Sequence, residues 1–254
     1  MGGRVERAVS RLRDLEGDRP TAVLSRVAWT AWLALRREPP EPWLVEKARV
    51  DRAFDGRFAV DTGGVTRLGT LRIDCENRHL GVDHIASDPG ELNRALDSLP
   101  PDLDRFTLVD LGSGKGRAVL IAAQRPFRRI IGVEFSRALH RVALENLDRF
   151  PSAERRCPRV ELTCADAATY ELPREDLVLF MYNPFGREVM RQVAASVRDS
   201  LRDAPRRLFV LYTSPVHADV WSHTGFEELK TAESFALFRP PRTAGAHLRL
   251  LRSA

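Results

Sequence analysis

Three acidic residues stand at the ends of three successive apolar segments. Asp110 follows Phe106-Thr107-Leu108-Val109, Glu134 follows Ile130-Ile131-Gly132-Val133, and Asp166 comes shortly after Val160-Glu161-Leu162-Thr163-Cys164. Carboxylates accept hydrogen bonds from hydroxyl and amino groups and attract cations, whereas they repel a pyrophosphate. If the three segments are neighbouring strands, the pattern favours a ligand that carries positive charge and hydroxyl groups.

The first of these residues opens the turn D-L-G-S-G-K-G-R, in which Gly112, Gly114 and Gly116 occupy every second position. Glycine has no Cβ, so it permits positive φ and close approach of a ligand to the backbone. A phosphate-binding loop would place Ser or Thr after its lysine, but Lys115 is followed by glycine. Dinucleotide-binding proteins carry G-x-G-x-x-G, and this chain has G-x-G-x-G instead.

The elements that must position these residues alternate between strand and helix from residue 106 onward. Alternation with short connections predicts an α/β fold, with a doubly wound, mostly parallel sheet covered by helices on both faces. We expect strands at 106–111, 129–134, 159–164, 176–182 and 207–213, helices at 115–125, 137–149, 186–202 and 216–222, a short helix after Asp166, and two last strands that form an antiparallel hairpin within 225–252. Ligands of such sheets bind at the carboxyl ends of the strands.

S-adenosyl-L-methionine has the charge that this edge requires, because its sulfonium and amino groups are positive and it carries no phosphate. We expect Asp110, Gly112, Ser113, Gly114 and Gly116 to surround its methionine part, and Glu134 to accept both ribose hydroxyls. Asp166 and Ala167 would meet the adenine. Taken singly, Glu134 and Asp166 could be helix N-caps, and Asp110 could be a turn former.

With these motifs, residues 105–252 resemble the class I, seven-strand S-adenosylmethionine-dependent methyltransferases. The segments V-D-L-G-S-G-K-G-R, I-G-V-E and L-F-M-Y-N-P-F-G-R-E-V are similar to those of the non-SET lysine methyltransferases of this fold. The last segment is also similar to the [DN]-P-P-[FYW] signature of enzymes that methylate planar amines, although one proline is missing. The resemblance implies methyl transfer to an amine of a small metabolite or of a protein lysine.

Residues of two segments are candidates for the acceptor side. Asn183, which would also border the cofactor, could aim an amine lone pair through a carbonyl group, and Tyr182, Pro184 and Phe185 could wall the pocket. Phe185 could equally be a core residue. Upstream, His84 and Ser87 occupy positions where relatives carry a Tyr-x-Pro-Thr-like loop, and His84 is a candidate general base.

The remainder of the chain divides into an N-terminal helical extension at 1–50, a lid or linker region at 51–104, and the catalytic core at 105–254. Within the first two regions we expect apolar helices up to about residue 37, among them one that bears Trp29 and Trp32, a chain break at residues 38–42, and a hairpin or an ordered loop within 60–71. The extension is expected to cover the mouth of the active site. From Pro89 a further helix is predicted.

Composition restricts the partners and the compartment. Of the 40 basic residues 37 are arginine and they are spread along the chain, so the net charge of +5 does not mark a nucleic-acid surface. Cys75, Cys157 and Cys164 lack metal-ligand spacing, and no metal is expected. No segment has the length of a membrane span, and no secretory signal is recognised, so a cytoplasmic location is expected. The alternatives are a nucleic-acid methyltransferase, an NAD-binding protein and a non-catalytic binding module.

Overall fold

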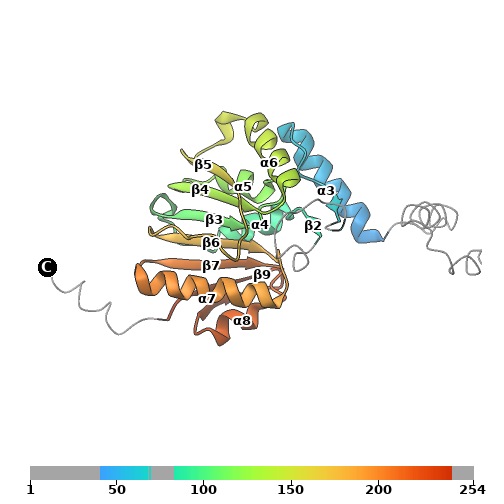
Figure 1. Ribbon diagram of the computed structural model, residues 1–254. Coiled ribbons are helices and arrows are strands. Elements are labelled where there is room, and N and C mark those ends of the chain that lie inside the picture. The colour runs from blue at the N-terminus through green and yellow to red at the C-terminus, as the bar shows by residue number, and fades with distance from the viewer. Residues whose placement is uncertain (1–40, 68, 70–82, 242–254) are drawn as a thin grey trace, which may run out of the picture. The chain divides into compact units, whose positions relative to one another are not determined.

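The computed structural model describes residues 41–67, 69 and 83–241 (Figure 1). The chain forms two compact units, residues 1–46 and 47–254, and the site considered below belongs to the second. The helices predicted before residue 38, including Trp29 and Trp32, lie outside the described residues, as does Cys75. The expectation that this extension covers the site therefore stays a prediction.

Seven of the described strands form one sheet, with the order β5-β4-β3-β6-β7-β9-β8. All neighbours are parallel except β9, which runs antiparallel to both β7 and β8. This order, with an antiparallel strand inserted next to the edge, is the Rossmann-like methyltransferase fold, so the predicted fold class is confirmed. The strands are β3 (Thr107–Leu111), β4 (Arg129–Glu134), β5 (Val160–Cys164), β6 (Leu177–Tyr182), β7 (Leu208–Thr213), β8 (Glu227–Thr231) and β9 (Phe235–Arg239).

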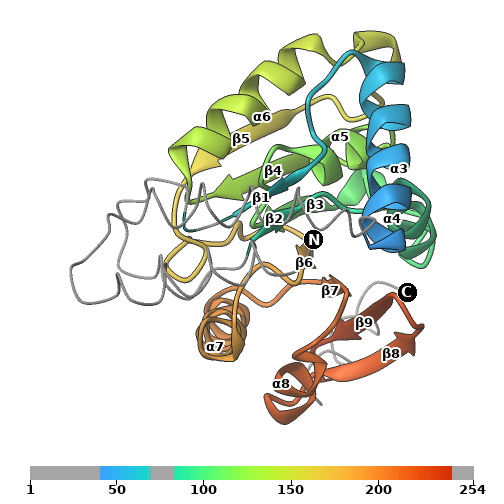
Figure 2. The same cartoon turned by 90° about the vertical axis from the view of Figure 1, so that its right-hand side faces the viewer.

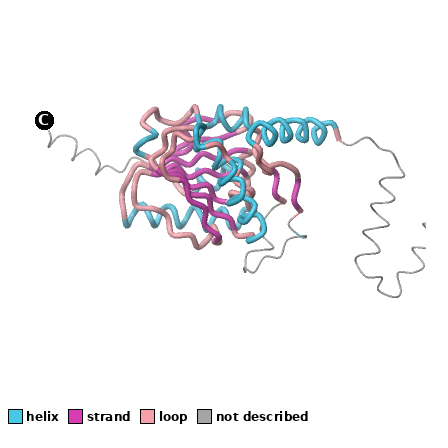
Figure 3. Tube along the Cα trace, turned by 90° about the horizontal axis from the view of Figure 1, so that it is seen from above, coloured by secondary structure: helices cyan, strands magenta, loops and turns pink. Residues whose placement is uncertain are grey.

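Helices cover both faces of this sheet, as Figures 2 and 3 show. Residues of α4 and α5 pack with Leu108 and Val178 on one face, and residues of α7 and α8 pack with Val109 and Leu179 on the other. Because both faces are buried, the central strands are continuous apolar runs rather than alternating ones. The helices are α3 (Pro42–Phe58), α4 (Pro89–Leu96), α5 (Arg117–Ala123), α6 (Arg137–Arg149), α7 (Arg187–Asp203) and α8 (Ala218–His223).

The edge strand β8 differs from the central strands, because all five of its residues are exposed. Its pairing with β9 is interrupted by a register shift between Glu228 and Lys230. Acidic and basic side chains therefore project from the last strand of the sheet.

Helix α3 was not predicted from the sequence, and the predicted boundary at residue 50 falls inside it. Its buried residues are Asp51, Phe54 and Phe58. The two phenylalanines belong to the core cluster on the α4–α5 face, and the Phe58 ring lies 4.9 Å from that of Phe150. The second half of α3 is thus a structural part of the second unit, residues 47–254.

Two other local predictions change. Val65–Thr66 (β1) pairs antiparallel with His84–Ile85 (β2), so the described part of the expected hairpin has a partner far along the chain; most of its predicted second arm lies outside the described residues. The short helix expected after Asp166 is wrong. Residues 166–169 instead form a single turn, which is closed by the hydrogen bond from the Thr169 N–H to the Asp166 carbonyl.

Replacing Phe58 by alanine tests the packing of α3. We expect the free energy of unfolding to fall by about 3–5 kcal/mol, because a buried aromatic ring is removed and a cavity remains. Denaturant unfolding measures the change. The control is Leu144→Ala on α6, where the side chain is 46% exposed and a change within about 0.5 kcal/mol is expected. Equal stabilities of the two variants would contradict the packing of α3 on the core.

Candidate functional site

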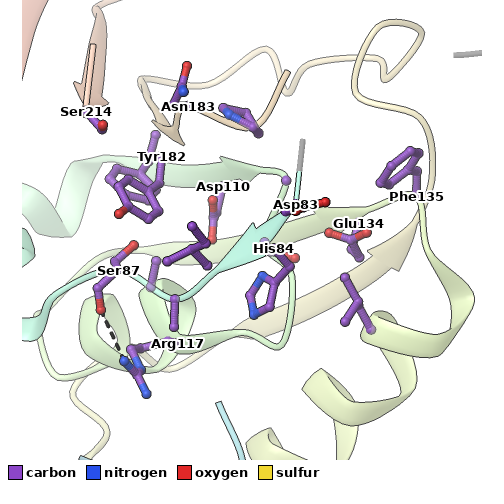
Figure 4. A pocket seen from close by; sticks show the side chains of 18 residues that line it. Asp83, His84, Ser87, Asp110, Arg117, Glu134, Phe135, Tyr182, Asn183 and Ser214 are labelled. Carbon is purple, nitrogen blue, oxygen red and sulfur yellow. Dashed lines mark hydrogen bonds between the residues drawn. The ribbon is translucent and has the colours of Figure 1, made fainter. Parts of the chain in front are cut away.

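A cavity of about 530 Å3 lies at the carboxyl ends of β3, β4 and β6, and the segment 83–87 forms part of its wall (Figure 4). A smaller hollow of about 40 Å3 adjoins it, because Gly112, Phe135 and Pro184 line both. The cavity is lined by most of the residues predicted for the site: His84, Ser87, Asp110, Gly112, Ser113, Glu134, Tyr182, Asn183 and Pro184. The hollow is lined by Asp166, Ala167 and Phe185.

The glycine turn adopts the backbone that its sequence predicts. Gly112, Gly114 and Gly116 have φ values of 86°, 54° and 89°, which side chains strongly disfavour. Space is equally restrictive. A Cβ at Gly112 would lie 2.4 Å from the Cβ of Pro184, and one at Gly114 would lie 2.3 Å from Nδ1 of His84. Gly114 and Gly116 do not line the cavity; they let His84 and helix α6, respectively, come close to the turn.

Asp110 is the most deeply buried acid of the cavity, with 2% of its surface exposed. Its Oδ2 has no hydrogen-bond partner among the described residues. Burial raises the pKa of this carboxyl to about 8, and the negative charge of Glu134 adds to the effect. An unpaired buried carboxylate is costly, so the site favours either a bound proton or a bound cation at this position.

Glu134 extends from the neighbouring strand and is 3% exposed. It accepts hydrogen bonds from the backbone N–H groups of Gly114 and Ser136, both at 2.8 Å. Burial raises its pKa to about 7, although these N–H groups favour the ionised form. The N-cap of α6 is Ser136, whose hydroxyl accepts the N–H of Leu139, so Glu134 does not cap this helix.

Asp166 and Ala167 follow β5 and line the smaller hollow. Oδ1 of Asp166 accepts the N–H of Ala168 at 2.9 Å, which fixes the carboxylate in the turn. Phe185 lines the same hollow and also belongs to the core cluster beside α7. Its interpretation as a core residue therefore holds, whereas its role as a wall of the acceptor pocket stays a prediction.

Asn183 stands at the end of β6 with a φ of 38°, a conformation that few non-glycine residues adopt. Its Oδ1 accepts a hydrogen bond of 2.9 Å from the hydroxyl of Tyr212. That hydroxyl also accepts the N–H of His217 at 3.3 Å. Ser214, at the end of β7, lines the same cavity and has a φ of 48°. Backbone conformations of this kind concentrate at functional sites.

Tyr212 was not among the predicted site residues, since a tyrosine within the apolar run L-F-V-L-Y-T has no pattern that sets it apart. Its ring is fully buried in the core and only its hydroxyl reaches the site, and burial raises its pKa to about 12. The side chain therefore stays neutral and can donate its proton to Asn183. Arg117 and Phe135 also line the cavity without having been predicted, although Arg117 directly follows the last glycine of the turn.

His84 lies on β2 with its ring against Gly114. Burial and, to a smaller extent, the positive charge of Lys115 lower its pKa to about 4. Its Nε2 is buried and has no partner among the described residues. The imidazole is thus neutral near pH 7 and a weak base. Tyr182, across the cavity, is half-buried, and its pKa is raised by burial and by the charges of Glu91 and Asp88.

Among residues 41–67, 69 and 83–241, no group of three or more His, Cys, Asp and Glu side chains could hold a metal ion. Within the same residues, no helix has both the length and the apolar character needed to cross a membrane.

Comparison with known proteins gave no match to a protein family and none to a curated protein. Solved structures do match. A glycopeptide N-methyltransferase in complex with S-adenosyl-L-methionine is 12% identical, with a TM-score of 0.49 over 61% of this chain and 95% of that one. A S-adenosylmethionine-dependent methyltransferase from Leishmania major is 13% identical, with a TM-score of 0.44 over 60% and 70%. A protein of the NADB-Rossmann superfamily from Streptococcus agalactiae is 15% identical, with a TM-score of 0.45 over 63% and 72%.

The contact between Gly114 and His84 can be tested by a double-mutant cycle. Gly114→Ala should lower the free energy of unfolding by more than Gly64→Ala, which has a φ of 80° but open space around its Cα. The control variant thus measures backbone strain alone, about 1–2 kcal/mol. Adding His84→Ala to Gly114→Ala should restore part of the extra loss, as read from denaturant unfolding. Strictly additive effects would exclude a direct contact.

Proposed function

We propose that the protein is a S-adenosyl-L-methionine-dependent methyltransferase whose acceptor is an amine nitrogen, on a small metabolite or on a protein lysine. The observation that carries this proposal is the buried Asp110 carboxylate, whose Oδ2 has no hydrogen-bond donor among the described residues, at the carboxyl edge of a methyltransferase-type sheet. A cationic ligand would supply the missing charge. The amine acceptor is suggested by the resemblance of the sequence motifs to those of the non-SET lysine methyltransferases.

The two adjoining hollows fit an elongated ligand with one charged end. Asp110, Ser113 and the turn at Gly112 would hold the methionine part, Glu134 would accept the ribose hydroxyls, and Asp166 and Ala167 would meet the adenine beside Phe185. Glu134 keeps lone pairs for this purpose, because each of its oxygens accepts one backbone N–H. When bound, the cofactor supplies an electrophilic methyl group on a sulfonium.

Asn183 and Tyr182 would orient the acceptor. The Tyr212 hydroxyl fixes Oδ1 of Asn183, and the left-handed backbone of Asn183 fixes the position of its carbonyl group. Together these constraints would present polar groups to an amine at a defined place, which is the kind of positioning that lowers a transfer barrier. Tyr182 and Pro184 would exclude water.

His84 is a weak base in this arrangement, so we assign it a wall position and hydrogen bonding rather than strong proton abstraction. An amine can enter the reaction as its neutral form, with a free lone pair, and lose its proton to solvent afterwards. This makes an amine acceptor more compatible with the site than a hydroxyl acceptor, which needs a base during the transfer. Ser87, beside His84, would close the same wall.

Calorimetry with S-adenosylmethionine, S-adenosylhomocysteine and NAD tests the proposal against an NAD-binding protein. Binding of the first two without NAD supports it, and NAD binding with silence of the others overturns it. A labelled-methyl assay on lysate, with protein, nucleic-acid and small-molecule fractions kept apart, then tests the acceptor. Label in nucleic acid alone would contradict the proposed acceptor class, and cofactor binding with no label in any fraction would favour a non-catalytic module.

Glu134→Gln should weaken binding of S-adenosylhomocysteine by about 1–3 kcal/mol, because charge-assisted hydrogen bonds to the ribose become neutral ones. The same calorimetric titration of Glu188→Gln, an exposed carboxylate on α7, should reproduce the affinity of the unaltered protein. Unchanged affinity of the Glu134 variant would place the ribose elsewhere.

The raised pKa values of Asp110 and Glu134 predict proton release on binding of S-adenosylmethionine. A cation stabilises the ionised carboxylates and lowers their pKa values, so protons leave on binding. Affinity therefore rises with pH through the range in which the carboxylates of the free protein ionise, and it levels off above about pH 8. The slope is at most about tenfold per pH unit for each proton released. Titrations in buffers of different ionisation enthalpy measure the proton count, which should fall in Asp110→Asn. A flat pH dependence would mean that both carboxylates are already ionised.

A further inference from the structure

The residues between the glycines of the turn have a role of their own. In the sequence G-S-G-K-G-R, the side chains of Lys115 and Arg117 extend to the segment Asp61–Gly64 rather than to the strands. The glycines of this short motif therefore set the backbone conformation beside the cavity, and its basic residues form hydrogen bonds with the segment 61–64.

Arg117 makes the central contacts. Its guanidinium is 2% exposed, donates from Nε to the Thr62 hydroxyl at 2.7 Å, and also donates to Asp51. Two further bonds of 3.3 Å run to Asp55 and to the backbone carbonyl of Ser87. Its Cζ atom lies 5.0 Å from the centre of the Phe54 ring. Helix α3, the segment 61–64 and the wall of the cavity thus meet on one side chain.

Lys115 and Asn146 hold the same segment from the neighbouring side. Nζ of Lys115 donates to the Gly63 carbonyl at 2.9 Å and to the Asp61 carboxylate at 3.0 Å. Fully buried Asn146 accepts the Asp61 N–H and donates to the carbonyls of Asp61 and Lys115, all at 2.8–2.9 Å. The side-chain amide of Asn146 therefore bonds to backbone groups of both the glycine turn and the segment 61–64.

The charges of this cluster are balanced, which makes its burial tolerable. Two positive groups, Lys47 and Arg117, face two negative ones, Asp51 and Asp55. Burial alone would raise the pKa of Asp51, but the bonds from Lys47, Arg117 and the Gly64 N–H outweigh it and the pKa is lowered. Asp55 accepts the N–H groups of Thr62 and Gly63, so α3 also holds the segment through its backbone.

The segment 61–64 leads directly into β1, and β1 pairs with β2, the strand that carries His84. The partners are Val65 with Ile85 and Thr66 with His84. Through this pairing, and through the direct bond to the Ser87 carbonyl drawn in Figure 4, the position of Arg117 determines where the wall formed by residues 83–87 stands. The wall faces Tyr182 and Asn183 across the cavity.

We propose that Arg117, assisted by Lys115, is a positioning residue that sets the 83–87 wall at a fixed distance from the cofactor turn. The role assigned to the wall rests on the proposed function, whereas the positioning itself does not. In this arrangement the turn that binds the cofactor also sets the acceptor side of the cavity, so the two substrates are aligned through one rigid motif.

Hydrogen exchange of the protein without cofactor tests the positioning. In Arg117→Met, amides of residues 62–66 and 84–87 should lose protection by at least about tenfold, since local opening no longer breaks these bonds. The matched control is Arg125→Met on the same side of the sheet, which removes a partly buried arginine bonded to Asn93 and Asp97 but leaves the wall untouched. Equal protection of the wall in both variants would overturn the proposal.

A milder variant covers the case in which Arg117→Met does not fold. Thr62→Val removes the acceptor of Nε but keeps every charge. The NMR titration of the His84 ring, assigned with His84→Gln, should then move from its low value towards the ordinary value of an exposed histidine, because the ring loses its cover. An unshifted titration would mean that the cluster stabilises the fold without placing the wall.

Calorimetry with S-adenosylhomocysteine separates this role from direct cofactor binding. We expect Arg117→Met to retain affinity within about threefold, as Asp110 and Glu134 are unaltered. A loss above tenfold with an unmoved wall would make Arg117 a cofactor ligand and would overturn the positioning role. If the unaltered protein binds no S-adenosylhomocysteine, the proposed function fails, while the exchange and titration results still decide the positioning.

Discussion

The left-handed backbone at Gly112, Gly114 and Gly116 is the constraint on which the site depends. Three positive φ values in five residues reverse the chain between β3 and α5 within a very short distance. The reversal leaves Asp110 at the floor of the cavity and brings the Gly114 N–H to Glu134, so it joins the ends of two neighbouring strands. It also directs Lys115 and Arg117 away from the strands. Any side chain at these glycines would strain the backbone or strike Pro184 or His84.

The second constraint on the site is the burial of acidic side chains without basic partners, because it makes the cavity favour a positively charged ligand. Asp110 and Glu134 lie on adjacent strands. Burial disfavours ionisation of both carboxyl groups, and the charge of Glu134 further disfavours that of Asp110. The basic cluster close by does not relieve them, since Lys47 and Arg117 are already matched by Asp51 and Asp55. The cavity therefore retains an unmet need for positive charge, although the chain as a whole carries a net charge of +5.

Sequence patterns predicted the sheet well. Its central strands are apolar runs bounded by turns, and the acids in β3, in β4 and after β5 meet at one edge because parallel strands end there together. Helix α3 was missed because its buried stripe is narrow and contains Asp51, which a hydrophobic pattern counts as a solvent residue. The roles of Tyr212 and Arg117 depend on contacts with residues about 30 to 65 positions away, which no local pattern contains.

The exposed strand β8 has a consequence for the state of the molecule in solution. A regular, uncovered strand edge can template the addition of a strand from another molecule. Here Glu227, Glu228 and Lys230 project from that edge, and the register shift beside Leu229 breaks the row of backbone groups that an incoming strand would need. Growth of the sheet by edge-to-edge pairing is disfavoured at β8. This protects the fold against aggregation without any cost to the cavity, because the cavity lies at the ends of β3, β4 and β6 in the middle of the sheet.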